Sequence, residues 1–283
     1  LMFETHRGVV EGDTDVVYLR PETAQGEFVN FLNVQRTTRA KVPFGIAQIG
    51  KSFRNEVTPG NFIFRTIEFE QMEHQWFCKE GTDVSYYEEY KKRAWEYLKS
   101  IGFNEEHLRY KDHDKLVHYA KHACDIQYLY PMGWQELNGI HNRTNYDLSR
   151  HQEYSGKSMM YMDPMTNEKY IPYIVEYSIG ADRLTLAVLC EAYDEQTLED
   201  GETRVVMHFA PCIAPFKACV LPLIKKTHAE KAEELQKMQY AADLIDVPVD
   251  TITGSLCIMA SKTTSPQASF LLNSGAVITI LDK

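Results

Sequence analysis

Residues 45–56 read Gly-Ile-Ala-Gln-Ile-Gly-Lys-Ser-Phe-Arg-Asn-Glu, and residues 62–73 read Phe-Ile-Phe-Arg-Thr-Ile-Glu-Phe-Glu-Gln-Met-Glu. The first segment alternates small or apolar residues with polar ones, a pattern typical of a β-strand. Residues 57–61, Val-Thr-Pro-Gly-Asn, have the composition of a turn. The stretch therefore predicts a strand, a turn and a returning strand.

The polar residues of this hairpin predict a ligand site. Arg54 and Glu56 are two residues apart, so they share one face of a strand, and Arg65, Phe69 and Glu73 share one face of the next. A guanidinium group can bind two phosphate oxygens at once through parallel hydrogen bonds, and an aromatic ring can stack on a purine. Carboxylates hold a metal or an ammonium group. The array suits a substrate with a polyphosphate and an amine. The alternative is a salt-bridged surface hairpin, which usually carries more lysine.

A second candidate phosphate site lies at the start of an apolar segment. Residues 178–182, Ser-Ile-Gly-Ala-Asp, precede Arg183, and residues 184–193 predict a helix. The free N–H groups and positive dipole at a helix N-terminus attract phosphate. The alternative is that Asp182 only caps the helix and Arg183 lies in solvent. Glu22 and Glu136 are isolated carboxylates that could bind a ligand cation or cap a backbone N–H.

Composition narrows the class of protein. The chain has 283 residues, enough for one large domain or a large and a small one, and a net charge of −10 opposes a generic nucleic-acid coat. No run of about 20 apolar residues and no signal peptide is visible, so we expect a cytoplasmic protein without a membrane partner. The chain begins at Leu1 in what reads as mid-domain sequence, and we expect its true N-terminus to be missing.

Cysteine and histidine spacing does not favour a metal centre. None of the six cysteines forms a C-x-x-C pair, so no zinc is expected. His118 and His122 are four residues apart in a predicted helix at 114–125, where an ordinary surface pair is the better interpretation than half a metal site.

Periodicity outlines the remaining elements. Helices are predicted at 27–40 and 83–101, and residues 126–177 read as β-rich. The stripe at Tyr86, Tyr90, Ala94, Tyr97 and Ile101 predicts core packing. Near residue 200 the sequence pattern changes. Beyond it, strands are predicted at 217–223, 247–252 and 276–281, with a helix at 228–244. This alternation predicts a small α/β domain with partly parallel strands and a boundary near 205–215.

Taken together, these motifs resemble the class II aminoacyl-tRNA synthetases. Arg54-x-Glu56 with Arg65-x-x-x-Phe69-x-x-x-Glu73 resembles motif 2 of that family, and Gly180-Ala-Asp-Arg183 resembles motif 3. Within the class, the sequence is most similar to the homodimeric bacterial-type glycyl-tRNA synthetases, at residues 19–26, 44–56, 69–73 and 170–173.

The resemblance implies an α+β fold and a set of ligands. It implies a class II antiparallel six-stranded sheet flanked by helices at 1–208, without motif 1, followed by a divergent α/β anticodon-binding domain at 209–283. It implies glycine–tRNA ligase activity, in which glycine and ATP form glycyl-adenylate and the glycyl group passes to glycine tRNA. ATP, Mg²⁺, glycine, glycine tRNA and a homodimer partner follow from the same resemblance.

Residue roles also follow from the resemblance. Arg54 and Arg183 would be catalytic, with Arg54 on the α-phosphate, and Glu136 would face Mg²⁺. The residues implied to bind ATP are Arg54, Asn55, Glu56, Phe64, Arg65, Phe69, Glu136, Leu137, Gly180, Asp182 and Arg183. Those implied to surround glycine are Glu22, Phe69, Glu70, Gln71, Glu73, Glu176, Ser178 and Gly180.

Two rival functions remain open at this point. One is a synthetase-like accessory or regulatory protein that no longer aminoacylates tRNA. It is motivated by Ile67 and Tyr177, which differ from the family's usual residues, and by the nearly chargeless segment 254–262. The other is a ligase that adenylates a carboxylate without using tRNA. Glycine-dependent ATP–pyrophosphate exchange and transfer to tRNA separate the three.

Overall fold

The computed structural model describes residues 2–10, 13–214, 218–222, 229–230, 256–260, 267–272 and 277–281. Its backbone contacts divide the chain into two units, Leu1–Cys190 and Glu191–Lys283. The first unit contains the elements that form the candidate site.

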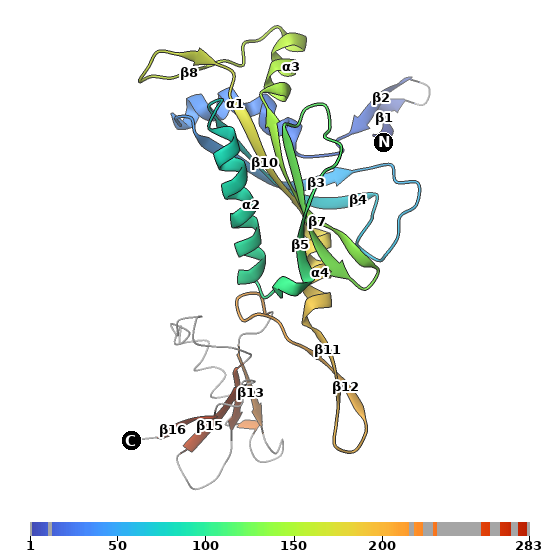
Figure 1. Ribbon diagram of the computed structural model, residues 1–283. Helices are drawn as coiled ribbons and strands as arrows, with labels where there is room; N and C mark the ends of the chain where they lie inside the picture. The colour runs from blue at the N-terminus through green and yellow to red at the C-terminus, as the bar shows by residue number, and fades with distance from the viewer. Residues whose placement is uncertain are drawn as a thin grey trace. The chain divides into compact units, whose positions relative to one another are not determined.

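The first unit is built on a six-stranded, wholly antiparallel sheet with the strand order β3-β4-β10-β7-β6-β5 (Figure 1). The strands are β3 (Phe44–Phe53), β4 (Glu68–Cys78), β5 (Leu108–Asp112), β6 (His122–Tyr130), β7 (Gly133–Thr144) and β10 (Tyr173–Gly180). This sheet confirms the fold class that the sequence predicted.

Helices and two small hairpins complete the first unit. The helices are α1 (Ala24–Thr38), α2 (Asp83–Ser100), α3 (Tyr146–Ser155) and α4 (Ala181–Ala192), with a short 3₁₀ turn η1 (Glu105–His107). The hairpins pair β1 (Phe3–Val10) with β2 (Asp13–Leu19), and β8 (Tyr161–Met162) with β9 (Lys169–Tyr170). Helices at 27–40, 83–101 and 184–193 were therefore correctly expected, each within a few residues.

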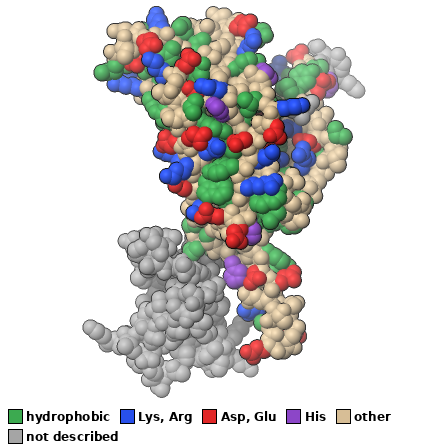
Figure 2. Space-filling view, viewed as in Figure 1, with side chains coloured by type: hydrophobic (Ala, Val, Ile, Leu, Met, Phe, Trp, Pro, Cys, Tyr) green, Lys and Arg blue, Asp and Glu red, His purple; other side chains and the backbone are tan. Residues whose placement is uncertain are grey.

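The surface of the first unit is mixed in charge. Figure 2 shows acidic and basic side chains intermingled on the visible face. Several form exposed ion pairs, such as Lys79 with Glu168 at 2.6 Å and Lys51 with Glu68 at 3.0 Å. Such pairs contribute only about 0–1 kcal/mol each. Among the described residues, no helix combines the length and apolar character that crossing a membrane requires.

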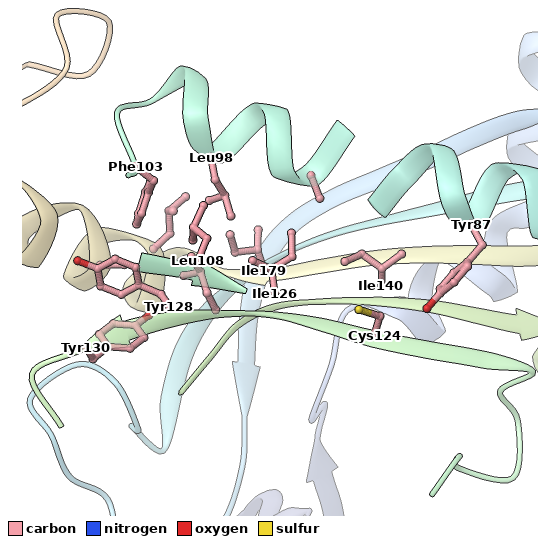
Figure 3. Packing of buried hydrophobic residues seen from close by; sticks show 14 of the residues in the cluster. Tyr87, Leu98, Phe103, Leu108, Cys124, Ile126, Tyr128, Tyr130, Ile140 and Ile179 are labelled. Carbon is pink, nitrogen blue, oxygen red and sulfur yellow. The ribbon is translucent and has the colours of Figure 1, made fainter. Parts of the chain in front are cut away.

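The two faces of the sheet differ in chemistry. One face carries Ile126, Ile140, Val175 and Ile179, all nearly fully buried, and these residues form one core cluster with Leu98 of α2. Figure 3 shows Leu98 pointing from its helix toward this apolar layer. Because successive strand residues point to opposite faces, the residues between them lie on the other face. That face is polar around Glu176 and Ser178, whereas further along it Phe77 and Ile174 pack against α1 in a second core cluster.

The face that helix α2 buries differs slightly from the one that the sequence predicted. Its buried residues include Tyr87, Ala94 and Leu98, whereas Tyr97 is exposed. Of the predicted stripe, Tyr86, Tyr90 and Ile101 are partly buried and pack against the same core, as Ala94 does from within it. The aromatic residues of the stripe line the edge of the contact between α2 and the core. The interpretation as core packing is therefore confirmed, but the most buried face of the helix is displaced by one residue from the predicted stripe.

One prediction of local structure is wrong, and another is incomplete. No helix forms at 114–125: residues 113–121 are a loop and His122 begins β6. The N–H of Lys121 donates to the carbonyl of Asn142 at 2.8 Å, so pairing with β7 outweighs helix propensity here. The β-rich stretch 126–177 also contains α3, which the sequence did not predict.

The described part of the second unit is mainly β-strand. Strands β11 (Tyr193–Thr197) and β12 (Thr203–Met207) form an antiparallel hairpin. A mixed sheet contains β13 (Ala218–Pro222), β14 (Leu256–Ala260), β15 (Gln267–Leu272) and β16 (Val277–Leu281), with β13 and β14 parallel and the other pairs antiparallel. The expected strands at 217–223 and 276–281 match β13 and β16. The expected strand at 247–252 and the helix at 228–244, apart from 229–230, lie outside the described residues, and the boundary at 205–215 stays a prediction.

The core predicts the outcome of a matched pair of leucine substitutions. Leu98 is completely buried, and Leu189 on α4 is 38% exposed. We expect Leu98→Ala to lower the free energy of unfolding by about 2–5 kcal/mol because it leaves a cavity between α2 and the sheet. Leu189→Ala should cost less than about 1 kcal/mol. Thermal and urea unfolding of both variants measure this, and equal losses would contradict the packing described.

Candidate active site

A cavity opens on the polar face of the six-stranded sheet. Of the predicted ATP residues, those that line it are Arg54, Glu56, Phe64, Arg65, Phe69, Glu136, Leu137, Gly180, Asp182 and Arg183. Of the predicted glycine residues, Glu22, Phe69, Gln71, Glu73, Glu176, Ser178 and Gly180 line it. Asn55 and Glu70 are exposed and do not line the cavity. The three arginines singled out from the sequence thus share one cavity, although their roles in binding stay predictions.

The arginines of the hairpin reach the cavity from a loop and not from paired strands. Strand β3 ends at Phe53 and β4 begins at Glu68, so the expectation that strand parity aligns Arg54 with Glu56 and Arg65 with Phe69 is wrong. The backbone N–H of Arg54 donates to the carbonyl of Ile67 at 2.9 Å. This hydrogen bond closes the base of the loop just beyond the two strands.

Specific contacts hold the two loop arginines. Nε of Arg54 donates to the carbonyl of Pro21 at 3.1 Å, and its guanidinium lies 5.3 Å from the centre of the Phe69 ring. Arg65 pairs with Glu56 at 3.3 Å, and its backbone bonds to Gly60 in both directions. A guanidinium that is already fixed loses less conformational entropy when it binds a phosphate.

Arg183 is held at the opposite wall. Its Nε donates to the carbonyl of Phe64 at 3.0 Å, and its guanidinium lies 4.3 Å from the Phe64 ring. Its Nη1 lies 3.4 Å from Oε2 of Glu136. Helix α4 begins at Ala181, and Asp182 accepts the N–H of Glu70 at 2.9 Å. The alternative in which Asp182 only caps the helix and Arg183 lies in solvent is therefore wrong.

A β-bulge brings Glu136 to this wall. In the pairing of β6 with β7, Ile126 faces Asn138 but the next residue, Gln127, faces Glu136, so Leu137 is skipped. A bulge shifts the alternation of side chains by one position. Glu136 consequently lies on the same polar face as Gly139, which simple alternation along β7 would not predict.

Carboxylates and amides occupy the other end of the cavity. The N–H of Thr23 donates to Oε2 of Glu73 at 2.8 Å, and the Thr23 hydroxyl donates to the same oxygen. Gln71 donates to Oε1 of Glu73 at 2.9 Å and contacts the hydroxyl of Ser178 at 3.1 Å. Burial, together with the nearby charge of Glu176, raises the pKa of Glu73 even though the Thr23 bonds act in the opposite direction.

Glu176 is the most firmly held of these carboxylates. Its oxygens accept from Arg143 at 2.8 Å and Gln75 at 3.0 Å, and lie 2.8 Å from Nδ1 of His141. Burial alone would raise its pKa, but the Arg143 and His141 contacts outweigh burial and lower the pKa. Arg143 is itself buried and makes a bidentate pair with Asp147 at 2.7 and 2.9 Å. Two neighbouring carboxyls, Glu73 and Glu176, thus have pKa values shifted in opposite directions.

A third carboxyl lies behind this end of the cavity without a partner. Glu27 of α1 is 2% exposed, and neither of its oxygens has a hydrogen-bond partner among the described residues. Burial and the charges of Glu73 and Glu176 raise the pKa of Glu27 to about 9, and the nearby backbone N–H of Gln75 offsets them only in part. We therefore expect the folded protein to hold this side chain protonated at neutral pH.

Several residues of the site were missed by sequence reasoning. His141, Arg143, Tyr119 and Gly139 line the cavity, and Glu27 lies buried behind it. The four-residue spacing of Arg143 and Asp147 predicts an ion pair on a helix, but Arg143 in fact lies at the end of β7. No local signal marks His141 or Glu27, because their surroundings come from strands and helices distant in sequence.

Comparison with known proteins places the chain in a family. The model of the tRNA synthetase class II core domain (G, H, P, S and T) matches residues 9–193, and the chain belongs to that family. Within it, the chain is similar to glycine–tRNA ligases: it is 58% identical over 240 residues to that of Clostridium kluyveri and 60% identical over 228 residues to that of Geobacillus thermodenitrificans. The alignments cover 84% and 80% of this chain but 52% and 49% of those relatives, so the chain spans about half their length.

A solved structure shares the fold. The structure of Giardia lamblia prolyl-tRNA synthetase in complex with prolyl-adenylate aligns with a TM-score of 0.68 at 16% identity, covering 99% of this chain and 59% of that chain. At this identity the likeness concerns the fold, and it agrees with the expectation of a class II synthetase sheet.

The unpartnered carboxyl of Glu27 predicts a pH-dependent stability effect. Its pKa is raised from 4.5 to about 9, so between these values the folded state binds more protons than the unfolded state and stability falls as pH rises. Glu27→Gln removes this dependence and should raise the free energy of unfolding at pH 8 by roughly 1–3 kcal/mol. The gain over wild type should grow from acid to alkaline pH.

Thermal unfolding across that pH range measures the effect. Glu153→Gln on the exposed surface of α3 is the control and should change stability little at any pH. A destabilised Glu27→Gln protein at pH 8 would show that the Glu27 carboxylate has a favourable partner.

Proposed function

We propose that this chain carries the glycine-activating site of a glycine–tRNA ligase. The ligase forms glycyl-adenylate from glycine and ATP and passes the glycyl group to the 3′ end of glycine tRNA. The proposal rests on one observation above all: the three arginines implied to bind ATP and the carboxylates Glu22, Glu73 and Glu176 line a single cavity. The similarity to glycine–tRNA ligases from two bacterial genera supports it.

The arginine end of the cavity suits ATP. The guanidinium of Arg54 lies 5.3 Å from the centre of the Phe69 ring, so a purine bound on that ring would have its α-phosphate near the guanidinium. Arg65 and Arg183 approach from the loop and from α4, where they would take the outer phosphates. Each arginine also has a protein acceptor, which fixes its direction before the nucleotide arrives.

The carboxylate end suits a small amino acid. The ammonium group of glycine would bind among Glu22, Glu73 and Glu176, next to Ser178 and Gln71. Glu176 already accepts from Arg143, Gln75 and His141, so its main contribution is to fix that wall. Glu73, whose pKa is raised by burial, gains most from an added cation.

Magnesium is the metal that the family implies. Glu136 is a half-exposed carboxylate on the cavity wall, which fits an ion that is usually carried by substrate phosphates and one or two protein carboxylates. When bound, the ion would neutralise phosphate charge beside Arg183.

The chemistry needs no side-chain nucleophile. The carboxylate of glycine attacks the α-phosphorus, the bond to the bridging oxygen breaks, and pyrophosphate leaves. Both reactants are anions, so the barrier comes largely from repulsion and alignment, which Arg54 and the fixed pocket reduce. A terminal hydroxyl of tRNA then attacks the glycyl carbonyl and AMP leaves.

The remaining assignments follow from the family resemblance. We propose a homodimer in the cytoplasm and an anticodon-binding role for the second unit, whose described strands form a mixed sheet. Aminoacylation of glycine tRNA by the chain, compared with adenylation alone, separates a tRNA ligase from a ligase that uses another acceptor.

Arg54 provides the decisive test of the activity. The protein should catalyse ATP–pyrophosphate exchange with glycine and not with other amino acids. Arg54→Ala should lower this exchange by roughly 10²–10³-fold because charge on the α-phosphoryl oxygens loses its partner. Arg150→Ala on exposed α3 is the matched control and should leave the rate within about twofold.

Binding of a non-hydrolysable glycyl-adenylate analogue, measured by calorimetry, gives a second readout that needs no turnover. Exchange by Arg54→Ala at the wild-type rate, with unchanged analogue affinity, would refute the assigned role. Absence of both exchange and analogue binding in the wild-type protein would refute the function.

Glu73 predicts how glycine affinity depends on pH. Its raised pKa means that the carboxyl takes up a proton as pH falls through the neutral range, and the protonated form no longer attracts an ammonium group. The KM for glycine should therefore rise on acidification. Glu73→Gln should bind glycine weakly at every pH and lose this dependence, and an identical pH profile in wild type and variant would contradict the assignment.

A further inference from the structure

We propose that His113, Asp125 and His141 form a binding site for a divalent transition-metal ion, with Zn²⁺ as the reference ion. The three residues each offer one donor atom, and these atoms all lie within 4.8 Å of one another. His141 also lines the cavity that contains Glu136, whereas His113 and Asp125 do not line it. The proposed site does not depend on the proposed ligase activity.

The sheet register brings the three residues together. His141 on β7 faces Ala123 on β6, and Asp125 lies two residues further along β6 on the same face. His113 follows directly after β5, and its N–H donates to the carbonyl of Ala123 at 3.1 Å. Two imidazoles therefore flank Ala123 from opposite sides, with the carboxylate beside them.

Small residues leave the room that these side chains use. Ala123 presents only a methyl group between the histidines, whose rings are 5.8 Å apart. Gly139 faces Asp125 across the β6–β7 pair. A Cβ at Gly139 would lie 3.2 Å from Cε1 and 3.5 Å from Nε2 of His141, and 3.6 Å from Oδ1 of Asp125. The same small space thus borders donor atoms of both residues.

One donor atom has no regular hydrogen-bond partner among the described residues. Nε2 of His113 is buried and lies 2.9 Å from Oδ2 of Asp125, an ion-pair contact whose angles fall short of a regular hydrogen bond. Two ligands of one tetrahedral zinc ion are about 3.3 Å apart, given bonds of about 2.0–2.1 Å. The 2.9 Å approach is near this ligand separation, and donor atoms of the set that lie up to 4.8 Å apart would have to approach by up to about 1.5 Å to reach it.

The surroundings of His141 match those of a metal-bound histidine. Its Nδ1 lies 2.8 Å from Oε1 of Glu176, a carboxylate that Arg143 holds in place. A histidine that donates through one ring nitrogen to a carboxylate presents the lone pair of its other nitrogen to a metal. Here that other nitrogen, Nε2, is the one near Asp125 and the space beside Gly139.

The donor set selects the class of ion. Two imidazoles and a carboxylate suit zinc and neighbouring transition metals, whereas Mg²⁺ and Ca²⁺ prefer oxygen ligands alone. Three protein ligands leave a fourth position for water, as in open zinc sites. The sequence expectation of no zinc rested on cysteine spacing, and this set contains no thiolate.

Equilibrium dialysis of the metal-free chain against Zn²⁺ and Co²⁺, with a chelating dye as competitor, tests the site. We expect one ion per chain, a four-coordinate Co²⁺ absorption spectrum, and no displacement by excess Mg²⁺. His141→Ala should weaken the binding by roughly 100-fold or more, since losing a ligand costs more than losing an outer partner. Asp125→Asn, which keeps the shape of the side chain, should also lower the affinity for Zn²⁺. It provides the test if the His141→Ala variant does not fold.

His118→Ala is the control, because His118 is an exposed loop histidine outside the cluster. It should bind Zn²⁺ as the wild type does. Comparison with this control separates binding at the proposed site from binding at cysteines or other surface groups. Equal Zn²⁺ affinity in wild type, His141→Ala and Asp125→Asn would overturn the proposal. Displacement by Mg²⁺ at comparable concentration would overturn the assignment to a transition metal.

Discussion

The period-two alternation of the antiparallel sheet is the constraint on which the rest of the structure depends. Every second residue of β6 and β10 places its side chain on the α2 side of the sheet, where Ile126, Val175 and Ile179 are buried. The intervening residues must then face the other side. Because apolar burial fixes the register, the polar residues are placed with the same certainty as the core. A slip of one residue would bury Glu176 against Leu98 and expose the isoleucines.

Burying charge on the polar face requires compensation. Arg143 joins Glu176 to Asp147, and all three are nearly inaccessible to solvent. Charges buried in this way rarely add stability over apolar residues, but removing one partner leaves a costly unpaired charge. The network therefore orients the wall of the cavity more than it stabilises the fold. Glu27 lacks such a partner, and its carboxyl is accommodated by holding a proton.

Irregularities in the strands give the site its chemistry. The bulge at Leu137 moves Glu136 to the cavity side, and the loop between β3 and β4 frees Arg54 from strand geometry. Small residues act in the same way, since Ala123 and Gly139 leave space in which two histidines and a carboxylate meet. The regular sheet supplies rigidity, and its interruptions aim particular groups.

The sequence by itself determined the family, the strand–loop–strand hairpin, the helices α1, α2 and α4, and most residues that line the cavity. These follow from local signals: alternation, helical spacing, turn composition and short sequence motifs. It failed where pairing with a distant strand overrode local propensity, as at residues 114–125. Asn55 and Glu70 belong to the right motif but do not line the cavity: Asn55 lies in the loop after β3, and Glu70 alternates with Phe69 and Gln71 along β4. Only the tertiary structure decided the surroundings of Glu27, the partners of Arg143 and the meeting of His113, Asp125 and His141, because pKa values and donor geometry depend on neighbours from separate segments of the chain.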